Sequence, residues 1–505
     1  MTNPDPRDEN LVSLIRRQSE RYDEKTFMTF GDGSTMSYRE FDLRVAAVRS
    51  QLWANNITSG AVAVMLKNSL FYPTAWLGIV TAGCVAVPVN SRLRVDDARY
   101  VLQHSEAVAA YSDDATRGTV EAAGAGGLKE ILGEPSEESP AAPEPSLHAG
   151  SLANIQYTSG TTGFPKGCRL THRFWQRMGA TAVDAMCIGE DDTLLTAQPH
   201  SYIDPQWNVI AALRAGAHLV LLDGFHPVTF MSDVARFGVN VFYCLGVMPT
   251  LLMKRSPDSS DRGHSLTRVF CSAIPAESHA AIERRWGIPW SEVFGMTETG
   301  INTVVTAEDH DRCLGTGSIG RPVAHNEATI VDEHDNEVPH GEVGELVLRG
   351  LGLMEGYHRD PEGTADFFRN GWAHTGDLAV RGEDGFIYLR GRRKEMIRRG
   401  GENISPLQIE TTLCSHNDVI ECAVAPVLDP DLGEEIKAYV VRRAGVITGA
   451  AELAEYLGQR LAPFKVPRYW EFRDGLPHTP SERVAKHELE KGRSDFREKS
   501  IDLRR

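Results

Sequence analysis

The chain has 505 residues, with 53 lysines and arginines against 69 aspartates and glutamates, so its formal net charge is −16. At roughly 100–200 residues per domain, this length predicts two to four domains. Hydrophobic residues make up 41% and charged residues 24%, which indicates a folded chain rather than a disordered one. The acidic balance disfavours a nucleic-acid partner, because such binding needs clustered cations.

Neither a membrane span nor a leader segment is expected from the sequence. The most apolar stretch, residues 75–89, contains Pro88 and is shorter than the roughly 20 residues of a span. The first ten residues are polar and lack the apolar core of a signal peptide. Eight cysteines occur without a C-x-x-C pair, which disfavours a disulfide or zinc framework and fits a reducing compartment. We therefore expect a cytoplasmic enzyme.

The first hundred residues alternate helix and strand patterns. Ser37-Tyr-Arg-Glu40 is a capping-box pattern, and the apolar residues after it have helical spacing. A buried strand is predicted over residues 61–66, a helix over 71–82 and a strand over 85–89. Residues 133–150 are rich in Pro, Glu, Ser and Ala, a composition typical of a surface excursion or linker.

From residue 190 onward the pattern changes twice. Strands alternate with helices up to about residue 300, which favours a parallel sheet with helices on its faces; the strands are predicted over residues 218–222, 239–245, 267–271 and 291–294. After about residue 320, short strands at 328–331, 344–349 and 386–389 indicate hairpins. Beyond residue 404 a compact α+β pattern follows, with helices at 406–415 and 450–461 and strands at 418–425, 436–442 and 468–472.

The segment Tyr157-Thr-Ser-Gly-Thr-Thr-Gly-Phe-Pro-Lys-Gly167 carries the strongest chemical signal. Its glycines let backbone N–H groups approach a polyanion, its hydroxyls add donors, and its lysine adds a positive charge. The residues expected to grip phosphate are Thr158, Ser159, Gly160, Thr161, Thr162, Gly163 and Lys166. A Walker A loop is excluded, because Gly167 rather than Ser or Thr follows the lysine. A solvated turn is the structural alternative.

The segment Gly315-Thr-Gly-Ser-Ile-Gly320 matches G-x-G-x-x-G. A dinucleotide fingerprint needs a strand before this pattern and a helix after it. Here the pattern follows a charged, turn-like run and leads into Arg321-Pro322. We therefore reject a dinucleotide-binding function for this segment.

The 157–167 loop resembles the signature of the adenylate-forming (ANL) superfamily, which includes acyl-CoA synthetases, firefly luciferase and peptide-synthetase adenylation domains. Four further motifs of that family follow in order: Val293-Phe-Gly-Met-Thr-Glu298, Trp372-Ala-His-Thr-Gly-Asp377, Gly391-Arg-Arg-Lys-Glu-Met-Ile397 and Gly400-Gly-Glu-Asn-Ile-Ser-Pro406. The resemblance extends from about residue 30 to residue 490. It is strongest to the carnitine/crotonobetaine-CoA ligase branch.

This resemblance implies an α/β fold with a large N-terminal domain of stacked α/β sheets and a small β-barrel-like part, followed by a small mobile α+β C-terminal domain. The domains are expected at residues 1–393 and 394–505, with a hinge near Lys394. The implied reaction activates a carboxylic acid with ATP and Mg²⁺ through an acyl-adenylate, then transfers the acyl group to CoA with release of AMP and pyrophosphate. The sequence leaves open whether the protein forms a homodimer.

The family implies roles for residues around the nucleotide. Glu298 is expected to bind Mg²⁺, Thr297 to contact the α-phosphate, and Asp377 and Arg392 to bind the ribose. The adenine pocket is expected between two segments, formed by Ser272, Ala273 and Ile274 and by Phe294 with Gly295 and Met296. The family usually has Gly-Gly-Ala and Tyr there, so this chain departs from it, although Phe still stacks on a base. Gly400 and Gly401 are expected to lie against the pantetheine arm of CoA.

An acyl pocket is expected near His200, Tyr202, Trp207 and Tyr243, with Met296 at its edge. A general-base role and a packing or gating role are both open for His200. We favour packing, because the carboxylic acid is already ionised at neutral pH. Aromatic residues near strand ends are also typical of plain core.

The chain departs most from the family near its end. The family has Pro-x-Gly-Lys there, with the lysine catalysing adenylation, whereas this sequence has Pro480-Ser-Glu-Arg483. Three alternatives remain: Arg483 acts directly, Lys486 reaches in from one turn later, or adenylation is impaired. Arginine keeps the charge but is longer and planar.

The leading hypothesis is therefore an AMP-forming acid–CoA ligase. The altered Arg483 region leaves open a second reading, an adenylating enzyme whose acceptor is not CoA but a carrier protein or an amine, or one that activates nitrite toward an amine. A non-catalytic nucleotide-binding protein is a third reading. The glycine-rich loop, Glu298 and Asp377 argue against it.

Overall fold

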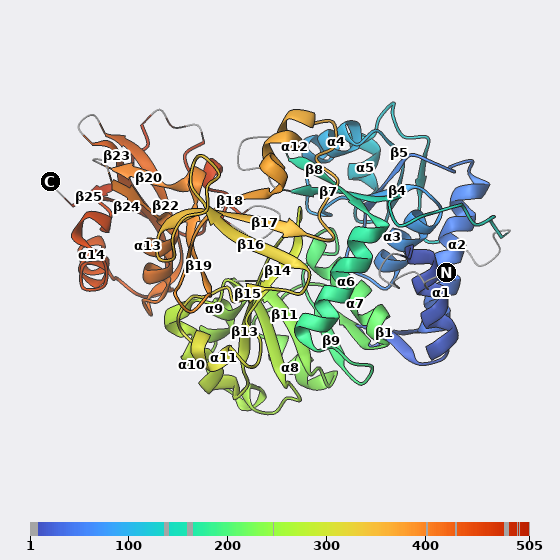
Figure 1. The fold of residues 1–505 in the computed structure, drawn as a ribbon, viewed down its shortest axis with the longest axis horizontal. Helices are drawn as coiled ribbons and strands as arrows, with labels where there is room; N and C mark the ends of the chain where they lie inside the picture. The colour runs from blue at the N-terminus through green and yellow to red at the C-terminus, as the bar shows by residue number, and fades with distance from the viewer. Residues whose placement is uncertain are drawn as a thin grey trace.

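The computed structural model describes residues 9–135, 141–158, 165–245, 247–399, 402–429, 432–478, 484–491, 493 and 495–503. These residues form a large N-terminal α/β part and a small C-terminal α+β part, as expected from the sequence. Figure 1 shows the C-terminal elements gathered at one end of the molecule, and helix α1 (Leu11–Tyr22) at the other.

The large part contains two mixed sheets in the described portion of the chain. The nine-stranded sheet has parallel strands at its centre and antiparallel pairs at both ends. Its order is β15 (Arg321–Pro322), β14 (Gly300–Val304), β13 (Trp290–Met296), β12 (Arg268–Ser272), β11 (Val241–Leu245), β9 (Thr193–Thr196), β10 (His218–Leu221), β1 (Thr26–Phe30) and β2 (Thr35–Ser37).

The second mixed sheet has six strands, which are parallel except for one antiparallel pair at its edge. Its order is β6 (Glu130–Leu132), β5 (Ala107–Ser112), β3 (Ala61–Met65), β4 (Val85–Pro88), β7 (Leu152–Thr158) and β8 (Lys166–Thr171). The antiparallel pair β7–β8 is joined by the glycine-rich segment. The sheet therefore presents the two ends of that segment at its edge.

Helices cover these sheets. They are α2 (Tyr38–Ala54), α3 (Phe71–Thr81), α4 (Val95–His104), α5 (Arg117–Ala123), α6 (His172–Met186), α7 (Ile203–Ala215), α8 (Phe230–Arg236), α9 (Val247–Met253), α10 (Ala276–Trp286) and α11 (His310–Cys313). Helix α3 is buried along its whole length, as expected for a helix that is apolar all round. A Cβ at Gly78 would lie 2.4 Å from Val48, so glycine permits the close approach of α2 and α3.

The hairpin-rich region is a four-stranded antiparallel sheet in chain order: β16 (Asn326–Val331), β17 (Val343–Gly350), β18 (Ala373–Arg381) and β19 (Ile387–Arg392). Helix α12 (Pro361–Phe367) lies between β17 and β18 in sequence. Strand β19 continues into a 3₁₀ turn, η4 (Arg393–Glu395). This turn leads directly into the C-terminal part.

The C-terminal part is one sheet with two α-helices in its described residues. The sheet order is β21 (Glu402–Ile404), β20 (Ile397–Arg399), β23 (Gly433–Arg442), β24 (Tyr469–Arg473) and β25 (Ile501–Asp502), and β22 (Val419–Asp429) also pairs with β23. The helices are α13 (Pro406–Cys414) and α14 (Ala450–Gly458), with a 3₁₀ turn η6 (Lys486–Glu488). The part has its own apolar core, centred on residues such as Ile409, Val440 and Trp470.

The local predictions agree closely with these elements. The capping box at Ser37 is confirmed, since its side chain accepts from the Glu40 N–H and the Glu40 carboxylate accepts from the Ser37 N–H. The Gly315–Gly320 segment leads into the two-residue strand β15 rather than a helix, which confirms its rejection as a dinucleotide motif. All eight cysteines are free.

Two predicted elements extend at least two residues beyond the observed ones. Strand β11 starts at Val241 rather than residue 239, because Val239 N–H closes the end of α8 by donating to Val234. Helix α14 ends at Gly458 rather than residue 461, because Pro463 disfavours a helical conformation in the residue before it. In the described part of the chain, no helix has the length and apolar character needed to cross a bilayer.

Candidate active site

Lys166 is the first residue of β8 and pairs across the hairpin with Thr158, the last residue of β7. Its Nζ lies 2.9 Å from Asp360 Oδ2 and 4.6 Å from the centre of the Tyr357 ring. The hydrogen bond from Lys166 holds the pKa of Asp360 below its usual value. The lysine ammonium group is thus directed at the segment just before α12. Ser159, Gly160, Thr161, Thr162 and Gly163 lie outside the described residues.

Glu298 lies in the turn between β13 and β14 and is buried, with 8% of its surface exposed. The Tyr357 hydroxyl donates to Glu298 Oε1 at 3.0 Å. Burial raises the pKa of this carboxyl, while Tyr357 and the positive charge of Arg392 act in the opposite direction. Tyr357 therefore joins Lys166 to Glu298: its ring faces the lysine and its hydroxyl holds the carboxylate.

Asp377 on β18 and Arg392 on β19 are directly opposite each other in the antiparallel pairing. Arg392 Nε lies 3.0 Å from Asp377 Oδ1. Asp377 is buried, and its backbone N–H donates to Thr375 Oγ1 at 3.0 Å. Both residues act electrostatically on Glu298. The structure thus brings Lys166, Glu298, Asp377 and Arg392 into one site.

The expected adenine loop begins where β12 ends. Ser272 Oγ donates to the Val293 carbonyl oxygen at 2.6 Å, which fixes the loop beside β13. Ala273 has a φ of +70°, a conformation that L-residues rarely adopt. The oxygens of the buried Glu292 carboxyl group accept from the N–H groups of Ala273 and Ile274, at 2.5 and 2.8 Å. Burial raises the pKa of Glu292 to about 8.

The second wall of the expected adenine pocket is formed by the end of β13. Phe294, Met296 and Thr297 are half-buried, and Gly295 is exposed. The pairing with β14 shifts register between Phe294 and Gly295. A Cβ at Gly295 would lie 2.6 Å from the Gly300 carbonyl oxygen, so only glycine fits this close backbone approach.

Two residues of the expected acyl pocket continue from the adenine loop. The Tyr243 hydroxyl lies 2.8 Å from Ser272 Oγ, and the Trp207 ring packs edge-on against Tyr243 at 5.0 Å. Tyr202 is held through its hydroxyl, which accepts from Asn90 Nδ2 at 2.9 Å. Tyr243 and then Trp207 therefore extend, contact by contact, from Ser272 of the expected adenine loop.

His200 is buried next to Tyr72, with the two ring centres 5.3 Å apart. Neither ring nitrogen of His200 has a hydrogen-bond partner among the described residues. Burial lowers the pKa of His200 to about 3, so the ring is neutral at physiological pH. This environment supports packing or gating rather than a general-base role.

Lys486 lies in the C-terminal part. Its Nζ contacts Glu395 Oε2 at 3.1 Å and Glu410 Oε1 at 2.8 Å. Burial alone would lower the pKa of Lys486, but Glu410 and Glu395 raise it above its usual value. Lys486 is thus held by one carboxylate from helix α13 and one from the η4 turn. Gly400, Gly401 and Arg483 lie outside the described residues.

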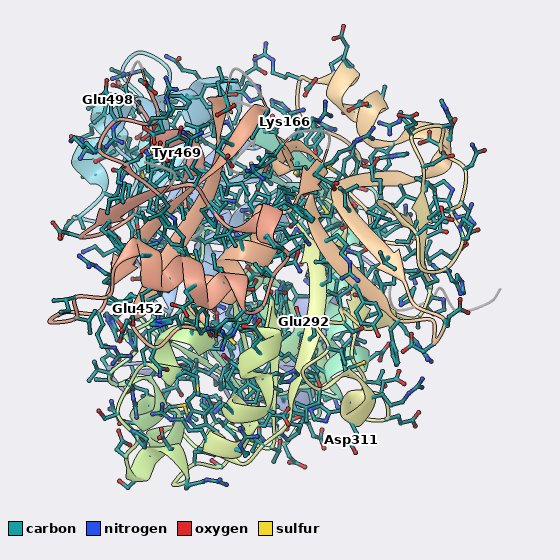
Figure 2. The ribbon with its side chains drawn as sticks, turned by 90° about the vertical axis from the view of Figure 1, so that its left-hand side faces the viewer. Lys166, Glu292, Asp311, Glu452, Tyr469 and Glu498 are labelled. Atoms are coloured by element: carbon teal, nitrogen blue, oxygen red, sulfur yellow. The ribbon has the colours of Figure 1, made fainter. Side chains whose placement is uncertain are left out.

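Figure 2 shows the molecule from the C-terminal side. Lys166 lies in the upper part of the view, Glu292 lies lower on β13, and Glu452 marks helix α14 of the small part facing the viewer.

Two known sequence families match this chain. The sequence profile of the AMP-binding enzyme family matches residues 15–358, and that of the AMP-binding enzyme C-terminal domain matches residues 408–483.

The chain is a member of the AMP-binding enzyme family. Among curated proteins, this AMP-binding enzyme is 32% identical to the sulfoacetate–CoA ligase of Cupriavidus necator over 500 residues, covering 95% of this chain and 97% of that protein. It is 31% identical to the crotonobetaine/carnitine–CoA ligase of Escherichia fergusonii over 481 residues, covering 90% and 92% of the two chains.

Solved structures show the same fold. ATP-bound MatB from Rhodopseudomonas palustris superposes with a TM-score of 0.84 at 29% identity, covering 95% of this chain and 98% of that chain. The apo form of MatB gives a TM-score of 0.74 over the same shares of the two chains. The anthranilate CoA ligase AuaEII, at 24% identity, gives a TM-score of 0.87. The AMP-binding enzyme described here is therefore closer in overall arrangement to the ATP-bound form of MatB than to its apo form.

Three residues of this AMP-binding enzyme's site were missed by sequence reasoning. Tyr357 and Asp360 lie in Gly356-Tyr-His-Arg-Asp-Pro361, which lacks the hydroxyl and glycine density of the phosphate-type loop. The sequence gives a clearer signal for Glu292, because it is an acidic residue beside Val293 and Phe294 in a predicted strand. A buried carboxyl without an obvious partner is a sign that backbone donors or a ligand lie nearby.

Proposed function

We propose that this protein is an ATP-dependent acid–CoA ligase that forms an acyl-adenylate and then a thioester, with release of AMP and pyrophosphate. The family match and the CoA-ligase relatives support this function. The observation that carries it is the contact chain from Lys166 through Tyr357 to Glu298, beside the Asp377–Arg392 pair. The site therefore combines a cation, a buried carboxylate and an Asp–Arg pair, and the pair is proposed to bind the ribose.

The reaction requires these charges. A carboxylate resists attack by a thiol, whereas an acyl-AMP has AMP as a good leaving group. In the first step the carboxylate oxygen attacks the α-phosphorus and pyrophosphate leaves, so negative charge accumulates around phosphorus. Lys166 and the backbone of its loop are proposed to stabilise the β- and γ-phosphates. Asp377 would accept hydrogen bonds from the ribose hydroxyls, and Arg392 would hold Asp377 in place.

Mg²⁺ is proposed to bind together with ATP, with Glu298 as its protein ligand. A carboxylate oxygen suits this hard cation, which is usually bound by one or two carboxylates together with substrate phosphates. The environment of Glu298 fits this role, because the carboxylate is buried and fixed by the Tyr357 hydroxyl at 3.0 Å. A bound Mg²⁺ would neutralise part of the phosphate charge.

The boundary between the domains is proposed to lie between residues 393 and 394. The C-terminal domain is proposed to rotate between the two half-reactions. The position of η4 between the two sheets supports this hinge. The different TM-scores to ATP-bound and apo MatB are consistent with a variable arrangement in a relative. The lysine at position 486 is bound to Glu395 and Glu410 in this arrangement. Arg483 therefore remains the first candidate for the charge delivered to the adenylation step.

An acceptor other than CoA is the second candidate function. The observation behind it is Glu482-Arg483, which stands where the family has glycine and lysine. An enzyme with the same first half-reaction could pass the acyl group to an amine or a carrier protein, or activate nitrite.

The test is to incubate the full chain with ATP, Mg²⁺, CoA and a panel of carboxylic acids, and to measure AMP, ADP and acyl-CoA by mass spectrometry. Acid-dependent AMP together with a thioester is expected. Asp377→Asn should weaken ATP-dependent turnover, whereas Asp366→Asn, at a carboxylate that is 79% exposed, should not. Acid-dependent AMP without a thioester would favour the second candidate.

Formation of ADP, or no nucleotide turnover with any acid, would contradict both candidates. The cytoplasmic location and the homodimer stay predictions. Cell fractionation and size-exclusion chromatography would test them.

A further inference from the structure

Two cysteines of the C-terminal domain lie in contact with each other. Cys414 is the last residue of α13, and Cys422 lies on β22. Their sulfur atoms are 3.4 Å apart, and Cys422 Sγ also lies 3.4 Å from the Glu410 carbonyl oxygen. Cys414 is half-buried and Cys422 is buried. A disulfide needs the sulfurs about 2.05 Å apart, so the two side chains must approach further before a bond can form.

The pair lies where the two domains meet. Lys254, just after α9 of the large domain, donates its ammonium group to the Ile420 carbonyl oxygen on β22 of the small domain. Both cysteines interact electrostatically with this lysine, and so do Glu421 and Arg443. The lysine is therefore a cation that the large domain supplies to a dithiol of the small domain.

The two thiols have different reactivities. The hydrogen bond from Cys422 and the charge of Lys254 lower the pKa of Cys414, although burial opposes this change. The pKa of Cys422 is raised well above its usual value by its hydrogen bond with Cys414 and by burial, with Glu410 acting in the same direction and Lys486 against it. A thiolate is the nucleophile in thiol oxidation. Cys414 is thus suited to attack a peroxide, and Cys422 is suited to attack the sulfenic acid that forms on Cys414.

We propose that Cys414 and Cys422 are a peroxide-sensitive dithiol that closes to a reversible disulfide, and that the docked position of Lys254 promotes its oxidation. The Cys414 thiolate attacks one oxygen of hydrogen peroxide, the O–O bond breaks, and hydroxide leaves and is protonated by solvent. The Cys422 thiol then attacks the sulfenic sulfur, the S–O bond breaks, and water leaves with the Cys422 proton. Two thiols are oxidised by two electrons and one peroxide is reduced to two waters.

The disulfide would join the end of α13 to β22. Helix α13 also carries Glu410, which binds Lys486, and Lys486 binds Glu395 of the η4 turn. The dithiol is thus two contacts away from the turn that connects the domains. Its oxidation rate would therefore depend on whether the domains are docked as in this structure.

A second pair of neighbouring cysteines provides an internal control for the oxidation of Cys414 and Cys422. Cys244 and Cys271 are neighbours on the paired strands β11 and β12, and both are completely buried. Burial raises the pKa of Cys271, and no described lysine or arginine is among the groups acting on it. This pair should stay reduced under conditions that oxidise Cys414 and Cys422.

The first experiment treats the full-length protein with hydrogen peroxide, blocks free thiols by alkylation and maps the peptides by mass spectrometry. The Cys187→Ser variant is used throughout, because Cys187 is exposed and could link two molecules. We expect a Cys414–Cys422 disulfide that dithiothreitol reverses, before Cys244 or Cys271 is modified. In Cys422→Ser, dimedone should trap a sulfenic acid on Cys414. Oxidation of Cys244 and Cys271 at the same rate, or alkylatable Cys414 and Cys422 after prolonged treatment, would overturn the proposal.

The second experiment tests the lysine of the other domain. Lys254→Gln should slow disulfide formation at neutral pH by at least ~threefold, because it lowers the thiolate fraction, and Lys254→Arg should restore most of the rate. Lys491→Gln, at a side chain that is 77% exposed, is the matched control and should behave as the parent. Equal rates in all four proteins would show that the docked lysine has no part in the oxidation.

Discussion

The hydroxyl of Tyr357 holds the Glu298 carboxylate at 3.0 Å, while the ring of the same side chain faces the Lys166 ammonium group at 4.6 Å. The lysine and the glutamate lie 132 positions apart in the sequence and come from different sheets or their connecting turns. One aromatic side chain therefore sets the separation of the positive and negative groups in the site.

Tyr357→Phe should separate these two contacts, because it keeps the ring under Lys166 and removes only the hydrogen bond to Glu298. A hydrogen bond to a charged group contributes about 1.5–3 kcal/mol, so acid-dependent pyrophosphate release should fall by roughly 10- to 100-fold. The control is Tyr388→Phe, which removes a hydroxyl near Asp384. A full rate in Tyr357→Phe would show that Glu298 needs no such support.

Glu292→Gln should change how stability depends on pH. The folded protein keeps the Glu292 proton up to about pH 8, whereas the unfolded chain releases it near the ordinary value of about 4.3. Between these values the unfolded state binds fewer protons, so the free energy of unfolding falls as pH rises. The stability of wild type relative to Glu292→Gln should therefore decrease from pH 5 to pH 8.5.

Thermal unfolding of both proteins across that range measures this difference. Glu342→Gln, at an exposed carboxylate, should follow the wild type at every pH. A constant gap between wild type and Glu292→Gln would contradict the protonated state of this buried carboxyl.

His200 should not contribute a titration to the activity profile. Its pKa of about 3 leaves the ring neutral from pH 5 to pH 8, so it cannot gain or lose a proton there. His200→Asn can lower the rate by disturbing the packing against Tyr72, but its pH–rate profile should run parallel to that of wild type. Disappearance of a titration near pH 6.5 in the variant would instead identify His200 as a general base.

Lys486→Gln should destabilise the protein, because it leaves Glu395 and Glu410 facing each other without their shared cation. Removing one partner of a buried ion pair costs about 3–5 kcal/mol, and the partial exposure of Lys486 places the expected loss at about 1–3 kcal/mol. Denaturant unfolding gives the value, with Lys491→Gln as the control at an exposed lysine. Equal stabilities would show that the pairing has no structural role.

Arg483→Ala should reduce acid-dependent pyrophosphate release at least ~100-fold, the effect of losing one transition-state donor. Thioester formation from presynthesised acyl-AMP should continue, because that half-reaction does not use the same group. If pyrophosphate release is unchanged, the catalytic cation is not Arg483. The role would then pass to Lys486, which would have to leave both of its carboxylate partners.

The elements with strong local signals were predictable. The buried strand at β3, the apolar helix α3 and the Ser37 capping box are each specified by a few adjacent residues, and each is where the pattern predicts it. The same holds for the order of elements in the C-terminal domain. Boundaries differ where a neighbouring element competes, as at Val239, whose N–H closes α8 instead of pairing in the sheet.

The contacts that organise the site were not predictable from spacing. Tyr357 reaches Glu298 across 59 positions, and the carboxyl group of Glu292 supports a loop that begins 19 positions earlier. Such contacts depend on how two sheets pack, which the periodicity of either strand does not encode. The motifs identified Lys166, Glu298, Asp377 and Arg392, which the structure brings together. They were silent about the residues that hold those side chains in position.

The short η4 turn between Arg392 and the first strand of the small domain has a consequence for engineering. A 3₁₀ helix has about three residues per turn and rises about 2.0 Å per residue. Deleting a single residue from Arg393–Glu395 would swing every downstream atom by about 120° around the axis of this turn. Grafts that exchange the small domain between relatives should therefore tolerate varied side chains at this junction, while its length must be preserved to the residue.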